Sequence, residues 1–174
     1  MNFRTIILLI ILLSGITIVF YITRHEKPSD ITEIKPLTSD TELYDINENK
    51  LMLAELKGSV IFINFWASWC PPCIDEMPII EQVSRNLSGN SKFKLVTILY
   101  REDKEKALRY LKENNYTFPV YTDHGGSAAR KFGVTGVPET YIIDKKGDLR
   151  ERVIGPLGWD SAQTIEICRK LINE

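Results

Sequence analysis

The chain has 174 residues, of which 22 are basic and 23 acidic, so its formal net charge is −1. A surface that binds nucleic acid is normally basic and clustered, and this composition offers neither property, so nucleic acid is not an expected partner. The residues beyond about position 41 are enough for one compact domain with its own core.

The N-terminus contains an uncharged, apolar run from Thr5 to Ile22, which Arg4 and Arg24 bracket. A membrane-spanning helix needs about 20 mostly apolar residues, so the run is just long enough. The alternative is a cleaved signal peptide, but the sequence TIVFYITRH lacks the small-x-small site that cleavage would need. We therefore expect a signal-anchor helix within residues 1–24, in contact with the lipid bilayer through residues 5–22.

A polar segment, residues 25–41, follows the apolar run and is expected to be a linker. It contains Pro28 and Pro36 and shows no sustained hydrophobic period. The remaining residues, 42–174, are expected to form the single folded domain.

Strand and helix patterns alternate along residues 42–174. Residues 42–56 predict an extra N-terminal strand or hairpin. The apolar, β-branched run at 59–65 predicts a strand buried on both faces, and the apolar stripe over 71–87 predicts a helix that Pro78 kinks. The later segments predict a strand at 93–100, a surface helix at 102–115, a strand at 118–123, a short helical piece at 127–132, two antiparallel strands within 139–155 and a closing helix at 159–173. This order predicts an α/β fold with a central mixed β-sheet flanked by helices.

A closely spaced cysteine pair, Cys70 and Cys73, stands where the strand at 59–65 gives way to the following helix. A cysteine at a helix N-terminus in a C-x-x-C sequence has a lowered pKa, and the thiolate is the form that attacks disulfides. We expect Cys70 to be the exposed nucleophile, with Cys73 shielded one turn later as the resolving thiol. Pro71 and Pro72 stiffen the turn and offer no backbone N–H to the Cys70 sulfur.

The cysteine pair has two other possible interpretations, a zinc site and a purely structural disulfide. A zinc site needs four N or S ligands, and beyond the pair the chain has only Cys168, His25 and His124. A purely structural bridge across two residues would contribute little through loop closure. Redox exchange is therefore the favoured chemistry, and no metal or other cofactor is expected. Cys168 lies in the apolar phase of the last helix and is expected to be a buried hydrophobe.

The sequences FINFWASWCPPC and GVTGVPETYIID together resemble the active-site turn and the cis-proline loop of the thioredoxin fold. With the N-terminal anchor, the chain is similar to the membrane-anchored TlpA/ResA/CcmG (DsbE) branch of thiol-disulfide oxidoreductases. The resemblance covers residues from about 42 to the C-terminus. It implies a thioredoxin-like domain outside the cytoplasm. Many members of this branch reduce apocytochrome c before haem attachment.

The resemblance also implies roles for individual residues. Cys70 and Cys73 would form the redox-active disulfide, and Pro138 would be a cis-proline packed against it. The alternative for Pro138 is an ordinary trans turn. A cis bond there would expose the Val137 backbone to an extended substrate, and Trp69 would pack beside the site.

Two acidic residues are implied near the pair. Glu76 would handle the proton of the buried sulfur, and Glu139 would belong to the rim of the site. The alternative for Glu76 is an exposed acid in the first turn of the helix, and the alternative for Glu139 is a surface strand residue. Thioredoxin keeps a buried aspartate six positions before its first cysteine. This chain has Asn64 there, which leaves the proton to Glu76 or Glu139.

The expected function is that of a membrane-tethered reductant of protein disulfides, including those of apocytochrome c, on the periplasmic or extracytoplasmic side. A membrane thiol-disulfide electron donor would re-reduce the cysteine pair. Three alternatives stayed open: a disulfide oxidant or isomerase, a peroxide-reducing redoxin, and a non-catalytic thioredoxin-fold binding module.

Overall fold

The computed structural model describes residues 4, 40–158 and 160–174. The predicted anchor, apart from Arg4, and nearly all of the predicted linker therefore lie outside the described residues. Within the described ranges, no helix is both long and apolar enough to cross a bilayer. Thr41 is buried, and its carbonyl oxygen accepts a hydrogen bond from the Leu53 N–H at 2.9 Å, so the folded domain includes at least this residue.

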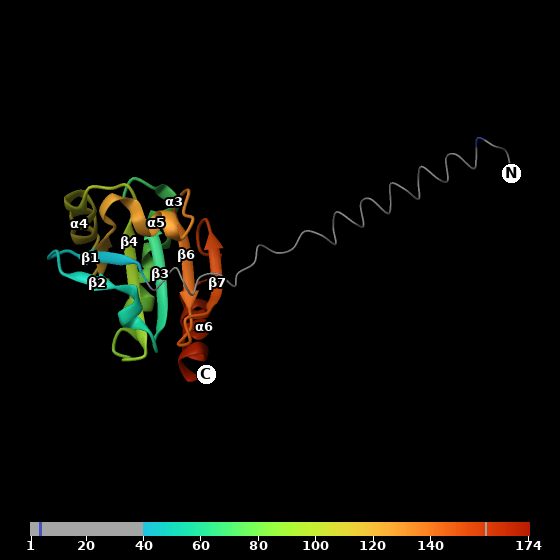
Figure 1. Cartoon of the computed structure of the whole chain (residues 1–174). Coiled ribbons are helices and arrows are strands. Elements are labelled where there is room, and N and C mark those ends of the chain that lie inside the picture. Colours follow the sequence, from blue (N-terminus) through green and yellow to red (C-terminus); the bar gives the residue numbers. More distant parts are fainter. Residues whose placement is uncertain (1–3, 5–39, 159) are drawn as a thin grey trace. The chain divides into compact units, whose positions relative to one another are not determined.

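A seven-stranded mixed sheet with the strand order β2-β1-β5-β4-β3-β6-β7 forms the centre of the domain (Figure 1). The strands are β1 (Glu42–Asp45), β2 (Lys50–Met52), β3 (Val60–Trp66), β4 (Phe93–Leu99), β5 (Val120–Thr122), β6 (Glu139–Ile143) and β7 (Leu149–Ile154). Strands β3, β4 and β5 are parallel, whereas β1, β6 and β7 pair antiparallel with their neighbours. The mixed sheet predicted from the sequence is confirmed.

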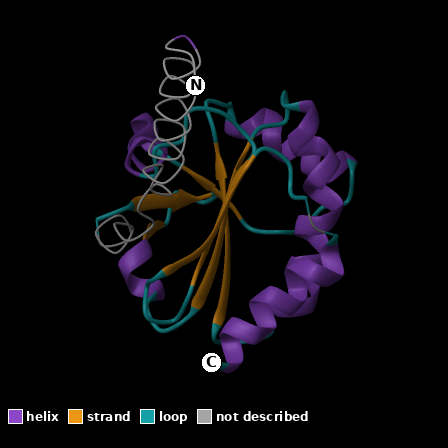
Figure 2. Ribbon diagram, turned by 90° about the vertical axis from the view of Figure 1, so that its right-hand side faces the viewer, coloured by secondary structure: helices purple, strands orange, loops and turns teal. Residues whose placement is uncertain are grey.

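Helices cover both faces of the sheet, which Figure 2 shows nearly edge-on. The helices are α3 (Pro71–Leu87), α4 (Lys104–Glu113), α5 (Ser127–Lys131) and α6 (Ser161–Asn173), with short 3-10 turns η2 (Leu53–Leu56) and η3 (His124–Gly126). Apolar residues of α3, α4 and α6 share one core cluster, which also contains the cysteine pair. Residues of α5 and η2 share the other. The two faces can therefore be compared as separate environments.

Strand β3 separates these two environments residue by residue, because successive side chains of a strand point to opposite faces. Phe62 and Trp66 belong to the cluster on the α3 face, whereas Ile63 and Phe65 belong to the cluster on the α5 face. All seven residues of β3 are buried, as expected for an apolar run covered on both sides. Asn64 is the polar exception, and its position in this alternation places it on the α3 face.

The remaining predicted elements are found close to their expected bounds. The N-terminal segment forms a β1–β2 hairpin, and Asp160 caps α6 by accepting a hydrogen bond from the Gln163 N–H at 2.8 Å. Helix α3 runs through Pro78 without interruption. On α4, Ala107 and Leu111 are buried.

Candidate active site

The Cys70–Cys73 pair forms a disulfide at the point where β3 ends and α3 begins. Cys70 has extended backbone angles and is the N-cap residue of α3, with Pro71 and Pro72 in the first turn. Proline suits this position because the first turn of a helix has no intrahelical use for its N–H groups. The predicted strand–turn–helix context of the pair is confirmed.

The first amide that follows the two prolines points at the sulfur. The Cys73 N–H donates to Cys70 Sγ, with 3.3 Å between nitrogen and sulfur. Pro71 and Pro72 have no N–H, so Cys73 supplies the polar contact that those residues cannot make. A donor at a helix N-terminus stabilises negative charge, so the reduced Cys70 sulfur is expected to favour the thiolate.

The loop before β6 lies against the disulfide. The Val137–Pro138 peptide bond is cis, as the resemblance implied, and the Val137 carbonyl oxygen lies 3.4 Å from Cys70 Sγ. A disulfide sulfur has no proton to donate, so in this form the approach is a close contact. In the reduced form the Cys70 thiol can donate to the same oxygen. The loop thus places backbone polar groups directly beside the reacting sulfur.

The exposure of the pair differs from the prediction. We expected an exposed Cys70 sulfur, but in the disulfide form only 3% of Cys70 is accessible, and Cys73 is fully buried. The neighbouring Trp69 side chain, by contrast, is 56% exposed. The cis-proline loop covers Cys70 from one side, which explains its burial. A partner would first meet Trp69 and Pro71, and it would reach the sulfur beside them.

The segment directly after β4 makes hydrogen bonds to both the cysteine turn and the cis-proline loop. Glu102 accepts hydrogen bonds from the backbone N–H and from the hydroxyl of Ser68, two residues before Cys70. The Tyr100 N–H donates to the Trp66 carbonyl at 2.8 Å, and its hydroxyl donates to the Thr135 carbonyl in the cis-proline loop at 3.3 Å. The cysteine turn and the cis-proline loop are therefore tied to one common support.

Glu76 lies one turn after Cys73 on α3, and only 2% of its surface is exposed. Its carboxylate accepts hydrogen bonds from Asn64 Nδ2 at 2.7 Å and from the Leu157 N–H at 3.1 Å. Burial raises the pKa of this carboxyl to about 7, because the two hydrogen bonds offset only part of the cost of removing the charge from water. A buried carboxyl that titrates near neutral pH is suited to proton transfer.

Glu139 is placed differently from the expected rim position. Its side chain is 2% exposed, and the alternation along β6 points it to the α5 face of the sheet, away from Glu76. There it accepts hydrogen bonds from Arg152 Nε at 2.8 Å and lies 2.6 Å from the Tyr141 hydroxyl. The backbone of Glu139 continues the cis-proline loop, but its carboxylate belongs to an ion pair on the other face. Of the two acids considered for the proton, Glu76 is the one on the cysteine face.

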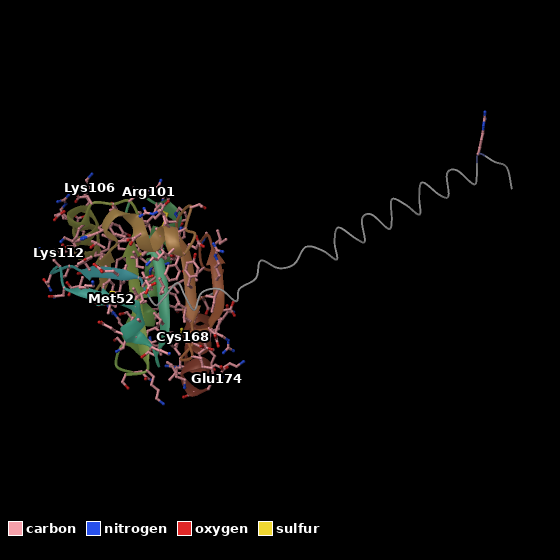
Figure 3. All side chains as sticks on the ribbon, in the orientation of Figure 1. Met52, Arg101, Lys106, Lys112, Cys168 and Glu174 are labelled. Atoms are coloured by element: carbon pink, nitrogen blue, oxygen red, sulfur yellow. A yellow bond between two sulfur atoms is a disulfide. The ribbon has the colours of Figure 1, made fainter. Side chains whose placement is uncertain are left out.

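Cys168 is a free, buried thiol, as the sequence predicted. Burial raises its pKa to about 12, so it is neutral at physiological pH. Figure 3 shows it toward the end of the domain opposite Arg101, which follows β4 at the end where the cysteine turn lies. Cys168 packs in the core and has no place in the site.

Three contributors to the site were missed at the level of sequence: Thr140, Leu157 and Glu102. Thr140 accepts a hydrogen bond from Asn64 Nδ2 at 2.9 Å, and the β3–β6 register places these two residues opposite each other. Leu157 acts through its backbone, which leaves no signal in the residue type. The position of Glu102 just after a strand gave no indication that it would meet Ser68.

Comparison with known proteins identifies similar sequences and structures. The sequence family described as Redoxin matches residues 31–166. Thiol-disulfide oxidoreductase ResA of Bacillus thuringiensis subsp. konkukian is 33% identical over 158 residues, which covers 88% of this chain and 87% of that protein. Thiol:disulfide interchange protein CycY of Rhizobium leguminosarum bv. viciae is 34% identical over 104 residues, or 59% of this chain and 54% of that protein.

A solved structure shows the same architecture. The crystal structure of a thioredoxin-family thiol:disulfide interchange protein from Chlorobium tepidum TLS superimposes with a TM-score of 0.64 at 25% identity. The match covers 78% of this chain and 97% of that chain. The thioredoxin-like α/β fold is thus supported by sequence and structure together.

Proposed function

Because the chain belongs to the Redoxin family, in its thioredoxin-like TlpA/ResA/CcmG branch, we propose that its thiol-disulfide oxidoreductase activity serves to reduce disulfides of exported proteins. The observation that carries the proposal is the cysteine pair at the start of α3, held against the cis-proline loop. Glu76, whose carboxyl has a pKa of about 7, lies one helical turn beyond the cysteine pair.

The proposed reaction begins with the reduced pair. The Cys70 thiolate attacks one sulfur of a substrate disulfide, which forms a mixed disulfide and releases one substrate thiolate. Cys73 then loses its proton to Glu76, and its thiolate attacks Cys70 Sγ, which releases the second substrate thiolate and leaves the Cys70–Cys73 disulfide. Two electrons pass from the pair to the substrate. A membrane dithiol donor returns them by the reverse exchange.

The surroundings of Cys70 support a polypeptide substrate. Trp69 offers an exposed, flat apolar surface beside the sulfur, and Val137 offers backbone groups for an extended chain. Aromatic side chains of this kind contribute strongly to protein recognition. The narrower proposal of apocytochrome c as substrate derives from the resemblance to the CcmG branch.

The proposed location is the extracytoplasmic side of the membrane, with the domain tethered by the N-terminal segment. The uncharged run from Thr5 to Ile22 supports this part of the proposal, because its length and composition suit a single membrane-spanning helix. Protease protection in sealed spheroplasts and membrane fractions would test it. A domain that stays protected from added protease in intact spheroplasts would contradict it.

Trapping tests the substrate. Cys73→Ser leaves Cys70 able to attack but removes the resolving thiol, so the mixed disulfide should accumulate and the attached protein can be identified. Recovery of an apocytochrome would support the narrow proposal, and Cys70→Ser is the matched control that should trap nothing. A trap that captures only unrelated proteins would contradict the cytochrome role.

The reduction potential of the cysteine pair tests whether the protein reduces or oxidises its substrates. A reductant should have a potential at or below about −200 mV, whereas a value near −120 mV, as in DsbA, would identify an oxidant. Equilibration of the full chain with glutathione buffers, followed by thiol alkylation, measures it.

A further inference from the structure

The Asn64 side chain is fully buried between two other polar groups. Its Nδ2 donates one hydrogen to Glu76 Oε1 at 2.7 Å and the other to Thr140 Oγ1 at 2.9 Å. Its Oδ1 is also buried and has no hydrogen-bond partner among the described residues. A buried amide whose nitrogen donates two hydrogen bonds while its oxygen accepts none is unusual, since most buried polar side-chain atoms have a partner.

This orientation of the amide fits only one protonation state of Glu76. An ionised carboxylate accepts hydrogen bonds through both oxygens, so it can receive Asn64 Nδ2 and the Leu157 N–H together. A protonated carboxyl has an O–H that needs an acceptor. An amide nitrogen cannot accept, so a proton on Oε1 would face a second donor.

Rotation of the amide by half a turn would remove that conflict. The amide oxygen would then take the place of Nδ2 and accept from the Glu76 O–H. It could also accept from the Thr140 hydroxyl, because a hydroxyl can donate as well as accept. Each orientation makes two hydrogen bonds and leaves one amide atom without a partner, so neither is strongly favoured by the number of its bonds.

We propose that Asn64 is a positioning residue for Glu76: its amide donates to the ionised carboxylate, and the amide turns over when the carboxyl takes up a proton. Thr140 serves as the second partner in both orientations. Asn64 occupies the position at which thioredoxin has a buried aspartate. The proposal gives this difference in residue type a physical role.

Among the residues that the structure describes, none places a charge beside Glu76 that would hold its carboxyl in one protonation state. Cys73 on α3 is in the disulfide, and Cys168 on the neighbouring helix α6 is a neutral thiol. Strands β3 and β6 present Asn64 and Thr140, and the segment after β7 presents only the Leu157 backbone. The charged pair Glu139 and Arg152 faces the other side of the sheet. Burial and the Asn64 and Leu157 hydrogen bonds are therefore left to set the pKa of Glu76, which lies near 7.

The inference deepens the proposed function and rests on it in one respect, the transfer of the Cys73 proton to Glu76. In that step the S–H bond of Cys73 breaks, an O–H bond forms on Glu76, and the Asn64 amide reverses to accept it. When the proton leaves, the amide returns to the donating orientation. The electron pair of the S–H bond stays on sulfur, which becomes the attacking thiolate.

Nuclear magnetic resonance of the full chain in detergent micelles tests the proposal directly. The Glu76 carboxyl carbon, assigned by its loss in Glu76→Gln, should titrate with a midpoint near pH 7. The Asn64 side-chain NH₂ signals should move with the same midpoint and lose this pH dependence in Glu76→Gln. An Asn64 NH₂ signal that is unaffected by pH from 5 to 9 would overturn the reversal of the amide.

Variants of Asn64 test its effect on the carboxyl. Asn64→Leu keeps a similar volume but removes the donor to the ionised form, so the Glu76 midpoint should rise by about one to two pH units. Asn64→Asp places a second carboxyl within hydrogen-bond reach, and the pair should titrate in two coupled steps, one above and one below the original midpoint. The proposal would be wrong if both variants showed a single Glu76 midpoint within about 0.3 pH units of the wild-type value. Such a change is far below the expected effect of a hydrogen bond to a charged group.

Thr97→Val is the matched control. Thr97 lies directly opposite Asn64 on β4, is equally buried, and donates to the Pro119 carbonyl rather than toward Glu76. Its replacement should leave the Glu76 midpoint unchanged, and an equal shift there would attribute the effect to loosened packing. If Asn64→Leu does not fold, the wild-type titration and Asn64→Asp still decide the question.

The failure of this inference can be told apart from that of the proposed function. A shifted Glu76 midpoint in Asn64→Leu, together with full exchange activity of Glu76→Gln, would keep the positioning role and remove the catalytic one. An unshifted Glu76 midpoint in Asn64→Leu, together with a large loss of activity in Glu76→Gln, would keep the catalytic role of Glu76 and remove the positioning role of Asn64.

Discussion

Two buried glutamates lie on opposite faces of the same sheet, and their surroundings differ. Glu76 on the α3 face and Glu139 on the α5 face are each 2% exposed. Glu76 has two neutral donors, Asn64 and the Leu157 N–H, and no cationic partner within the described part of the chain. Glu139 has the Arg152 guanidinium, with 2.7 Å between Nη2 and Oε1, and the Tyr141 hydroxyl.

The difference between these two environments shows how one fold can hold one buried acid in an ion pair and leave another suited to proton transfer. A buried carboxylate beside a guanidinium belongs to an ion pair in which each charge compensates the other. A buried carboxylate with only neutral donors has a raised pKa, which suits it to accept and release protons. The arrangement places the compensated acid behind the cis-proline loop and the uncompensated one beside the cysteines.

The largest expected effect distinguishes the two acids by activity. Glu76→Gln removes the proposed base and should lower the rate of disulfide exchange at pH 7 about 10²-fold or more, whereas Glu139→Gln should lower it less than about tenfold. Because Glu76 must be ionised to accept a proton, the wild-type rate should rise with pH through about 7, and this inflection should vanish in Glu76→Gln. Stopped-flow tryptophan fluorescence with a peptide disulfide measures both. Equal losses in the two variants would contradict the assignment.

The next effect concerns stability and pH. The pKa of Glu76 is about 7 in the folded chain against an ordinary value of 4.5, so the folded state binds more protons between these values. The stability that this group contributes is therefore fully present below pH 4.5 and is lost as the pH rises through 7, by an amount on the order of 3 kcal/mol.

Urea unfolding of the oxidised protein between pH 5 and pH 8 measures this loss. The difference in unfolding free energy between wild type and Glu76→Gln isolates Glu76 from other titrating groups. In Glu76→Gln the decline should be absent. Parallel pH profiles for the two proteins would show that Glu76 titrates in its ordinary range.

The smallest effect tests the compensated face. Arg152→Met keeps a long apolar side chain but leaves the Glu139 carboxylate without its cation, which should cost about 2 kcal/mol of stability because breaking a buried pair is costly and Arg152 is partly exposed. The double variant Arg152→Met with Glu139→Gln should recover more than half of the loss, since neither charge then remains. Denaturant midpoints measure all three. A double variant as unstable as Arg152→Met alone would mean that packing, not charge, explains the cost.

Much of the architecture could be predicted from local pattern. The apolar run at 59–65 and the helical stripe at 71–87 match β3 and α3 closely, because burial on both faces and amphipathic periodicity are written into residue type. The Cys70 and Cys73 spacing, followed by helix, predicted the redox turn. The cis Val137–Pro138 bond was implied by resemblance to a known motif and is present.

The position of Glu139 could not be predicted in this way. Every residue of β6 is buried, so its burial pattern does not show which face a given side chain occupies. The exposure of Cys70 was also misjudged, because the covering loop comes from a segment 67 positions later in the chain.

The sequence by itself determined the order of strands and helices and the position of the cysteine pair at the start of a helix, because these features depend on residues that are close together in the chain. Only the tertiary structure decided which acid shares the cysteine face. The register of β3 against β6 sets Asn64 opposite Thr140, 76 positions away, and the chain after β7 brings the Leu157 N–H to Glu76 across 81 positions. Contacts of such separation form only when the strands have paired and the helices have packed, so no local pattern contains them.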